Sequence, residues 1–200
     1  MCIRDRVSTF LQNVVSTDSK YYSVSDAFRA LVVVDTIAAR KKVDALLIRD
    51  SHQDVIRSSA ISFFGSVKSD KNYNRLKELA SYGGTTWDAR PEAVSQLSRY
   101  AKEKRETVDI FVNLLEDRSR DVRRRAIYAL ATHGDKTHLG PLDEVMFKDP
   151  ALGRDIRYAK KRILNPSKKP TKNSVEQKLE EANRKPVSYT HLTLPTTSKV

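Results

Sequence analysis

Four arginines recur through the chain at nearly constant spacing, and they are the side chains best suited to bind an anion. The spacing is 33, 33 and 34 residues between Arg57, Arg90, Arg123 and Arg157. A guanidinium group is planar and permanently charged, so such a column suits phosphate or carboxylate ligands. It equally suits a structural ladder, in which each arginine ties neighbouring loops together through aspartates such as Asp50, Asp117 and Asp121. We favour the ladder.

Other reactive side chains form no catalytic pattern in this sequence. His133 and His138 are five residues apart around a Gly-Asp turn, but no third metal ligand follows in order, so we expect turn histidines. The sequence has no H-E-x-x-H, no phosphate-binding loop, no G-x-S-x-G and no dinucleotide-binding glycines. We therefore expect no catalytic residue, no cofactor and no metal within this chain.

The arginines belong to a longer internal repeat. Alanines recur every 33 residues at Ala27, Ala60, Ala93 and Ala126. A large apolar residue follows each alanine by four positions, at Leu31, Phe64, Leu97 and Leu130. A fifth copy is predicted at a spacing of 34, with Arg157 in the arginine position, Lys160 in the alanine position and Leu164 in the apolar position. Units of this length must stack to bury their apolar faces.

Each copy predicts two amphipathic helices. The second helix carries the motif, as in residues 121–130, where Val122, Ala126 and Leu130 share one face. The first helices are predicted around residues 10–15, 43–48, 73–80, 108–115 and 139–147. We therefore expect an all-α fold, a right-handed α-solenoid of about five helix pairs over residues 7–164.

The second helices should line the concave surface of this solenoid. Exposed positions there are predicted to include Arg29, Arg99, Arg125 and Tyr128. This surface is mixed in sign and poor in aromatic residues, whereas duplex DNA requires a continuous basic stripe. A protein or peptide is therefore the favoured partner, and nucleic acid is disfavoured.

The net charge of +12 does not change that preference, because half of it is concentrated near one end. Residues 160–185 contain nine basic and three acidic side chains, a balance of +6. The repeats themselves are only mildly basic. No apolar run approaches the length of a membrane span.

Both ends of the chain resemble translated sequencing adaptor. The first five residues can be encoded by ATG TGT ATA AGA GAC, whose reverse complement encodes Val-Ser-Tyr-Thr-His, the residues at 187–191. We therefore expect adaptor at 1–6 and 187–200, a Pro- and Lys-containing linker at 165–173, and a truncated charged helix at 174–186. On this interpretation the native protein extends beyond both ends, and its compartment, bacterial cytoplasm or periplasm, is not assigned.

The motif order resembles HEAT repeats, and the whole run is similar to one enzyme family. Asp117 followed by Val122-Arg123-x-x-Ala126-x-x-x-Leu130 is HEAT-like. Together with the run from Asp50 to Ala60, and Tyr82-Gly83 before Arg90, it resembles the C-terminal helical region of bacterial aminopeptidase N-like zinc aminopeptidases, the gluzincins. The charged segment at 178–185 is similar to the helix that closes many of them.

The resemblance implies a role without chemistry of its own. The zinc and its ligands would lie in an upstream catalytic domain, and this helical region would pack on that domain and shape access of peptides. The alternative is a standalone HEAT-repeat scaffold for protein–protein interaction, and a HEAT-like nucleic-acid binder is the weaker third possibility.

Overall fold

The structure, a computed structural model, describes residues 2–166, which contain ten α-helices, three short 3-10 helices and no strand. The all-α class is therefore confirmed. The first helices of the pairs are α1 (Ile3–Thr17), α3 (Thr36–Leu47), α5 (Asp70–Ala80), α7 (Glu106–Leu114) and α9 (Leu139–Lys148). The second helices are α2 (Tyr21–Val34), α4 (Val55–Ser66), α6 (Arg90–Leu97), α8 (Arg120–His133) and α10 (Gly153–Leu164).

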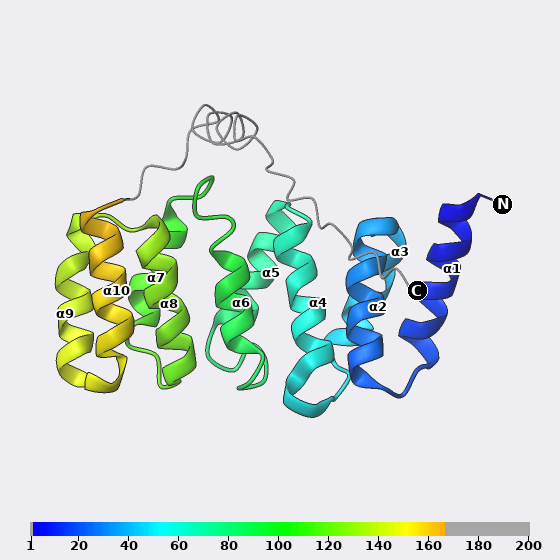
Figure 1. The fold of residues 1–200 in the computed structure, drawn as a ribbon, viewed down its shortest axis with the longest axis horizontal. Coiled ribbons are helices and arrows are strands. Elements are labelled where there is room, and N and C mark those ends of the chain that lie inside the picture. The colour runs from blue at the N-terminus through cyan, green and yellow to red at the C-terminus, as the bar shows by residue number, and fades with distance from the viewer. Residues whose placement is uncertain (1, 167–200) are drawn as a thin grey trace, which may run out of the picture. The chain divides into compact units, whose positions relative to one another are not determined.

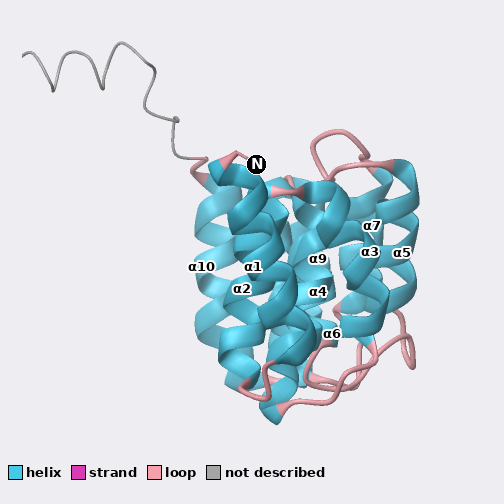
Figure 2. Ribbon diagram, turned by 90° about the vertical axis from the view of Figure 1, so that its right-hand side faces the viewer, coloured by secondary structure: helices cyan, strands magenta, loops and turns pink. Residues whose placement is uncertain are grey.

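The helices pack as successive pairs that follow the order of the chain (Figure 1). Each first helix contacts its second helix, and each second helix contacts the next, from α2 through α4, α6 and α8 to α10. Contacts between successive first helices are sparser. Viewed along the row, the helices lie side by side and the loops gather at their two ends (Figure 2). This solenoid-like stack of five pairs matches the predicted number of repeats.

The repeat motif supplies the core. The motif alanines are buried, and Ala60, Ala93 and Ala126 are fully inaccessible. The apolar residues four positions later are also buried at Leu31, Phe64, Leu97 and Leu130. A small side chain lets neighbouring helices approach closely, and the larger side chain one turn later fills the space between repeats. The repeated positions of the sequence motif are therefore the residues that pack in the core.

The register predicted for the fifth repeat is wrong by one residue. Ala159 is fully buried and Ile163 is 7 % exposed, whereas Lys160 is only half-buried and Leu164 is 48 % exposed. The spacing of 33 therefore continues from Ala126 to Ala159. A lysine at a position that is dry in the other repeats would lose its hydration without an ion partner, and the one-residue shift avoids this cost.

Side-chain caps fix where several helices begin. The side chains of Asp35, Ser69 and Ser119 accept hydrogen bonds from backbone N–H groups in the first turns of α3, α5 and α8. Such caps satisfy donors that the helix itself leaves unpaired. They also fix where the turns before these helices end.

The adaptor segments predicted at the two ends of the chain both stay predictions. Helix α1 begins at Ile3 and crosses the predicted boundary at residue 7, so the adaptor assignment of residues 1–6 stays a prediction. The predicted helix at 174–186 and the adaptor at 187–200 lie outside the described residues, as does the linker beyond residue 166.

Candidate functional site

The arginines of the column cap the C-terminal ends of the first helices. In three repeats the guanidinium group at this position donates to a backbone carbonyl at or just beyond the C-terminal end of the first helix in its own repeat. The donor–acceptor distances are 2.6 Å from Arg57 to Leu47, 3.1 Å from Arg90 to Ala80 and 2.6 Å from Arg123 to Asp117. Carbonyls at a helix end lack partners within the helix, so this contact satisfies them.

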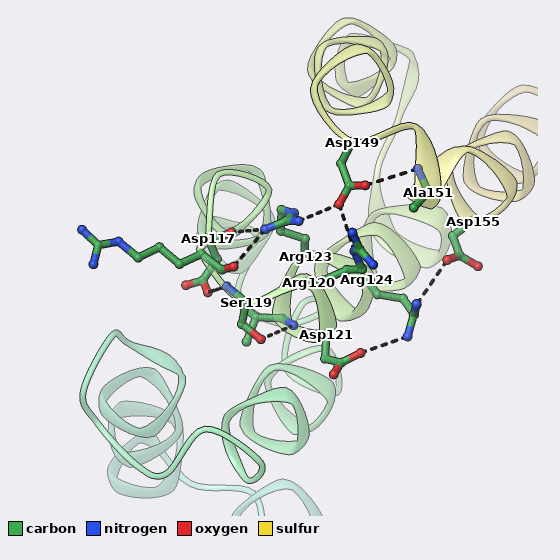
Figure 3. A network of polar contacts seen from close by, with 11 residues as sticks. Asp117, Ser119, Arg120, Asp121, Arg123, Arg124, Asp149, Ala151 and Asp155 are labelled. Atoms are coloured by element: carbon green, nitrogen blue, oxygen red, sulfur yellow. Dashed lines mark hydrogen bonds and ion pairs between the residues drawn. The ribbon is translucent and has the colours of Figure 1, made fainter.

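The same guanidinium groups reach into the following repeat. Arg90 on α6 forms a two-point contact with the carboxylate of Asp117, in the turn between α7 and α8. Arg123 on α8 donates to Asp149, in the turn between α9 and α10, at 2.6 Å (Figure 3). Each arginine therefore joins the turn of its own repeat to the turn of the next one.

Arg57 completes its contacts differently because the third repeat has glycine in place of the turn aspartate. Gly83, with φ +78°, stands at that turn. Arg57 instead pairs with Asp50 at 3.0 Å and with Asp54, both in its own repeat. The link to the third repeat is the hydroxyl of Thr86, which accepts from Arg57 at 3.1 Å and donates to Asp54.

The fifth repeat departs from the predicted column, and the first repeat has no arginine in it. In the fifth repeat Ile156 occupies the arginine position and is fully buried, while Arg157 is exposed and forms no ion pair with an aspartate of residues 2–166. In the first repeat Val24 occupies that position. There Arg49, from the turn of the second repeat, donates to the carbonyls of Val15 at 3.0 Å and Asp18 at 2.5 Å.

The column is therefore a structural ladder and leaves little surface for a ligand. The side chains of Arg57 and Arg90 are only 8 % and 2 % exposed, and their donors are directed at the contacts above. Arg123, together with Arg120, holds the pKa of Asp149 below its ordinary value through hydrogen bonds and charge. Asp121, expected in the same ladder, instead pairs with Arg124 on its own helix at 2.9 Å.

The exposed side of the second helices, here called the second-helix face, is the remaining candidate. All four side chains predicted to contact a partner are exposed there: Arg29, Arg99, Arg125 and Tyr128. Arg99 donates to Ser66 of the preceding repeat at 3.3 Å, and the Tyr128 hydroxyl donates to Asp155 at 2.8 Å. Asp155 occupies the position that is Ile56, Ala89 and Val122 in the second to fourth repeats, and it accepts hydrogen bonds from α8.

Sequence reasoning missed Tyr158 and Lys161 on this face because of the register error. With Ala159 as the anchor they lie one residue before and two residues after the alanine, and both are exposed. The alanine at a spacing of 33 was the signal that could have identified them. Arg154, also exposed, lies one turn before Tyr158 at a position that the predicted pattern did not include. This end of the face is consequently more basic and more aromatic than predicted.

Neither a metal site nor a membrane span is found among residues 2–166. No cluster of three or more His, Cys, Asp or Glu side chains is placed to hold a metal ion in this part of the chain. Within the same residues, no helix combines the length and apolar character that crossing a membrane requires.

Comparison of the chain with protein-family models, with curated proteins and with solved structures finds no match. The resemblance to HEAT repeats and to zinc aminopeptidases therefore stays a prediction from the residues that carry it.

Proposed function

We propose that residues 7–164 form a helical-repeat interaction module that binds a polypeptide along the second-helix face. The supporting observation is that three exposed aromatic side chains lie on or beside α8 and α10, two of them on these helices and one in the turn before α6. Tyr128, Tyr158 and Trp87 are 40 %, 50 % and 55 % exposed. Tyrosine, tryptophan and arginine dominate the binding energy of protein interfaces, because each combines a large contact area with a polar group.

The ladder supports this role by making the surface rigid. The buried Arg90 and the half-buried Arg123 link the turns of consecutive repeats, so the second helices are held at fixed spacing. A preorganised surface loses less conformational entropy when a partner binds. A polypeptide that crosses several second helices would therefore meet side chains already in place.

A finer form of the proposal follows the family resemblance. The partner would then be the catalytic domain of a zinc aminopeptidase in the same protein, and the module would shape the route of peptides to the zinc. Reading the source gene upstream of the codon for Val7 tests this form. An H-E-x-x-H motif followed by a zinc-binding glutamate supports it, whereas a start codon without that motif leaves the standalone scaffold.

Selection from a random peptide library displayed on phage tests the general proposal. We expect the full chain to enrich peptides whose binding is lost when Tyr128 and Tyr158 are both changed to Ala. The matched control changes two exposed apolar residues on other helices, Ile37 and Phe147, to Ala. Enriched peptides that bind the Tyr128→Ala/Tyr158→Ala variant as tightly as the wild type would contradict the proposal, and so would a selection without enrichment.

A further inference from the structure

The polarity of the second-helix face changes along the row of helices. Helix α4 presents the small hydroxyls of Ser58, Ser62 and Ser66. At the next repeat, Asp88 precedes α6 and Glu92 lies on it. Beyond them the surface becomes strongly basic on α8 and α10. We call this surface the α8–α10 patch, made of Arg125, Tyr128, Arg154, Arg157, Tyr158 and Lys161.

The repeat register interleaves cations and rings in this patch. A step of 33 residues relates Arg125 to Tyr158 and Tyr128 to Lys161, so each ring on one helix has a cation at the matching position of the other. The rings of Tyr128 and Tyr158 meet edge to face, with centroids 6.0 Å apart. This pairing fixes both rings against each other across the two helices.

The cations of the patch are available to a partner. Arg125, Arg154, Arg157 and Lys161 are exposed, and within residues 2–166 none of their side chains forms a hydrogen bond or an ion pair. Arg124, on α8, illustrates how an arginine of this surface binds carboxylates. It donates to Asp121 at 2.9 Å and to Asp155 at 3.2 Å, so one guanidinium group already holds two carboxylates (Figure 3).

A hollow borders the patch on the α6 side. It has a volume of about 300 Å³ and is lined by Trp87, Asp88, Pro91, Asp121, Arg124 and Arg125. Trp87 and Pro91 form the apolar part of its lining, and the other four residues are charged; Arg125 belongs to both the hollow and the patch. An apolar side chain could enter it while neighbouring residues of the same segment reach the cations.

We propose that the α8–α10 patch binds an acidic polypeptide segment, with carboxylates on Arg125, Arg154, Arg157 and Lys161 and an apolar side chain in the hollow beside Trp87. This inference rests on the proposed function and names the chemistry of the partner. Charge complementarity selects the partner, because four exposed cations without ion partners outnumber the nearby carboxylates. Those carboxylates are Asp121 and Asp155, which Arg124 already binds, and Asp88 in the hollow.

The extent of the patch favours a peptide over nucleic acid. A duplex that crosses the N-terminal halves of the second helices would leave the basic region at α6. There it would meet Asp88 and Glu92, because Arg99 lies beyond the opposite end of that helix. A phosphate backbone needs cations over its whole length of contact. The edge-to-face pairing of Tyr128 and Tyr158 also covers ring surface on which single-stranded bases would stack.

Fluorescence anisotropy with the full chain tests this inference. The probe is a fluorescein-labelled decapeptide of glutamates with one central leucine, and its matched control has glutamine at every glutamate. We expect the glutamate peptide to bind at about 50 mM salt, to weaken several-fold at about 200 mM, and to bind at least tenfold more tightly than the glutamine peptide.

Charge reversal locates the binding site. Arg125→Glu/Arg154→Glu should weaken the glutamate peptide at least tenfold. The matched control Lys41→Glu/Lys71→Glu makes the same change in net charge at exposed positions on α3 and α5, and should change affinity less than twofold. Both variants retain the basic residues at 168–185, so those residues cannot account for a difference. Circular dichroism verifies that both variants fold.

Three results would overturn the inference. Equal loss of affinity in the two charge-reversal variants would mean that only net charge matters. Tighter binding of a fluorescein-labelled oligothymidylate than of the glutamate peptide, lost in Arg125→Glu/Arg154→Glu, would identify a nucleic-acid surface. Phage selection that yields uncharged peptides dependent on Tyr128 and Tyr158 would refute the acidic partner and leave the proposed function standing.

Discussion

Changing Arg90 to Met is the sharpest test of the ladder. The methionine keeps much of the side-chain volume but removes every donor, while Asp117 stays in its turn. The side chains of Arg90 and Asp117 are 2 % and 8 % exposed, so the carboxylate would lose a charged partner in a place that water hardly reaches. The carbonyl of Ala80 would lose its donor in the same change.

The expected loss follows from this burial. Removing one partner of a buried ion pair typically costs about 3–5 kcal/mol in the free energy of unfolding. Since about 1 kcal/mol shifts Tm by roughly 2–4 °C for a domain of this size, a loss of 3 kcal/mol corresponds to roughly 6–12 °C. Arg75→Met is the control, because its pair with Glu78 is 46 % and 64 % exposed and such pairs contribute at most about 1 kcal/mol.

Thermal and urea unfolding of four proteins completes the test. We compare the wild type, Arg90→Met, Asp117→Asn and the double variant. Because Arg90 and Asp117 act as a pair, the double variant should lose less free energy of unfolding than the sum of the single losses. If Arg90→Met melted like Arg75→Met, or if the two losses simply added, the ladder would not link the third and fourth repeats as described.

Three further predictions concern single sites. A Cβ atom at Gly65 would lie 2.9 Å from the Cβ of Gln96, so Gly65→Ala should destabilise the fold by about 1–3 kcal/mol, and Gln96→Ala should partly restore stability in urea unfolding. The pKa of Asp149 in the folded protein lies below its ordinary value of 3.8, chiefly because Arg123 donates to it. The ionised Asp149 therefore stabilises the fold above about pH 4, and this contribution is lost as pH falls through the folded pKa. Asp149→Asn should consequently narrow the difference between the Tm at about pH 5 and the Tm at about pH 3. Burial lowers the pKa of His133 from 6.5, so the contribution of the neutral imidazole to stability is complete above about pH 6.5 and declines as pH falls. His133→Gln should therefore narrow the difference between the Tm at about pH 7.5 and the Tm at about pH 5.5. An unchanged difference would contradict the assignment of this pH dependence to His133.

The helix pairs could be predicted because one repeat unit encodes its own packing. A small residue and a large apolar residue one helical turn later recur where neighbouring helices meet, so Ala60 with Phe64 and Ala126 with Leu130 mark the core without any structure. The same periodicity placed Arg29 and Arg125 on the exposed side. Local periodicity therefore determined both the fold class and the second-helix face.

The fifth repeat shows where periodicity is ambiguous. At a spacing of 34, Ile156 and Arg157 match the motif; at 33, Ala159 and Ile163 match it. The burial of Ala159 shows that the spacing is 33, because the alanine position is buried in the preceding repeats and a lysine would be unfavourable there. The cost of burying Lys160 argues against the spacing of 34 more strongly than the arginine at position 157 argues for it. This comparison would have given the correct register from the sequence.

The partners of the ladder could not be predicted from spacing. Arg49 caps the end of α1 from the turn of the next repeat, a role that the motif assigns to the position of Val24. Arg57 reaches Thr86 because Gly83 supplies no carboxylate. Such contacts depend on the reach and direction of long side chains across neighbouring repeats, which a repeat length does not specify.

Photo-crosslinking tests most directly whether the second-helix face binds a polypeptide. A benzophenone amino acid replaces Tyr128 on this face in one protein and Lys71, on α5, in another, and each is irradiated with the labelled glutamate–leucine peptide and with a peptide from the phage selection. We predict crosslinks from position 128 that excess unlabelled peptide abolishes, and none from position 71. Crosslinks from position 71 alone, or equally from both positions, would contradict it.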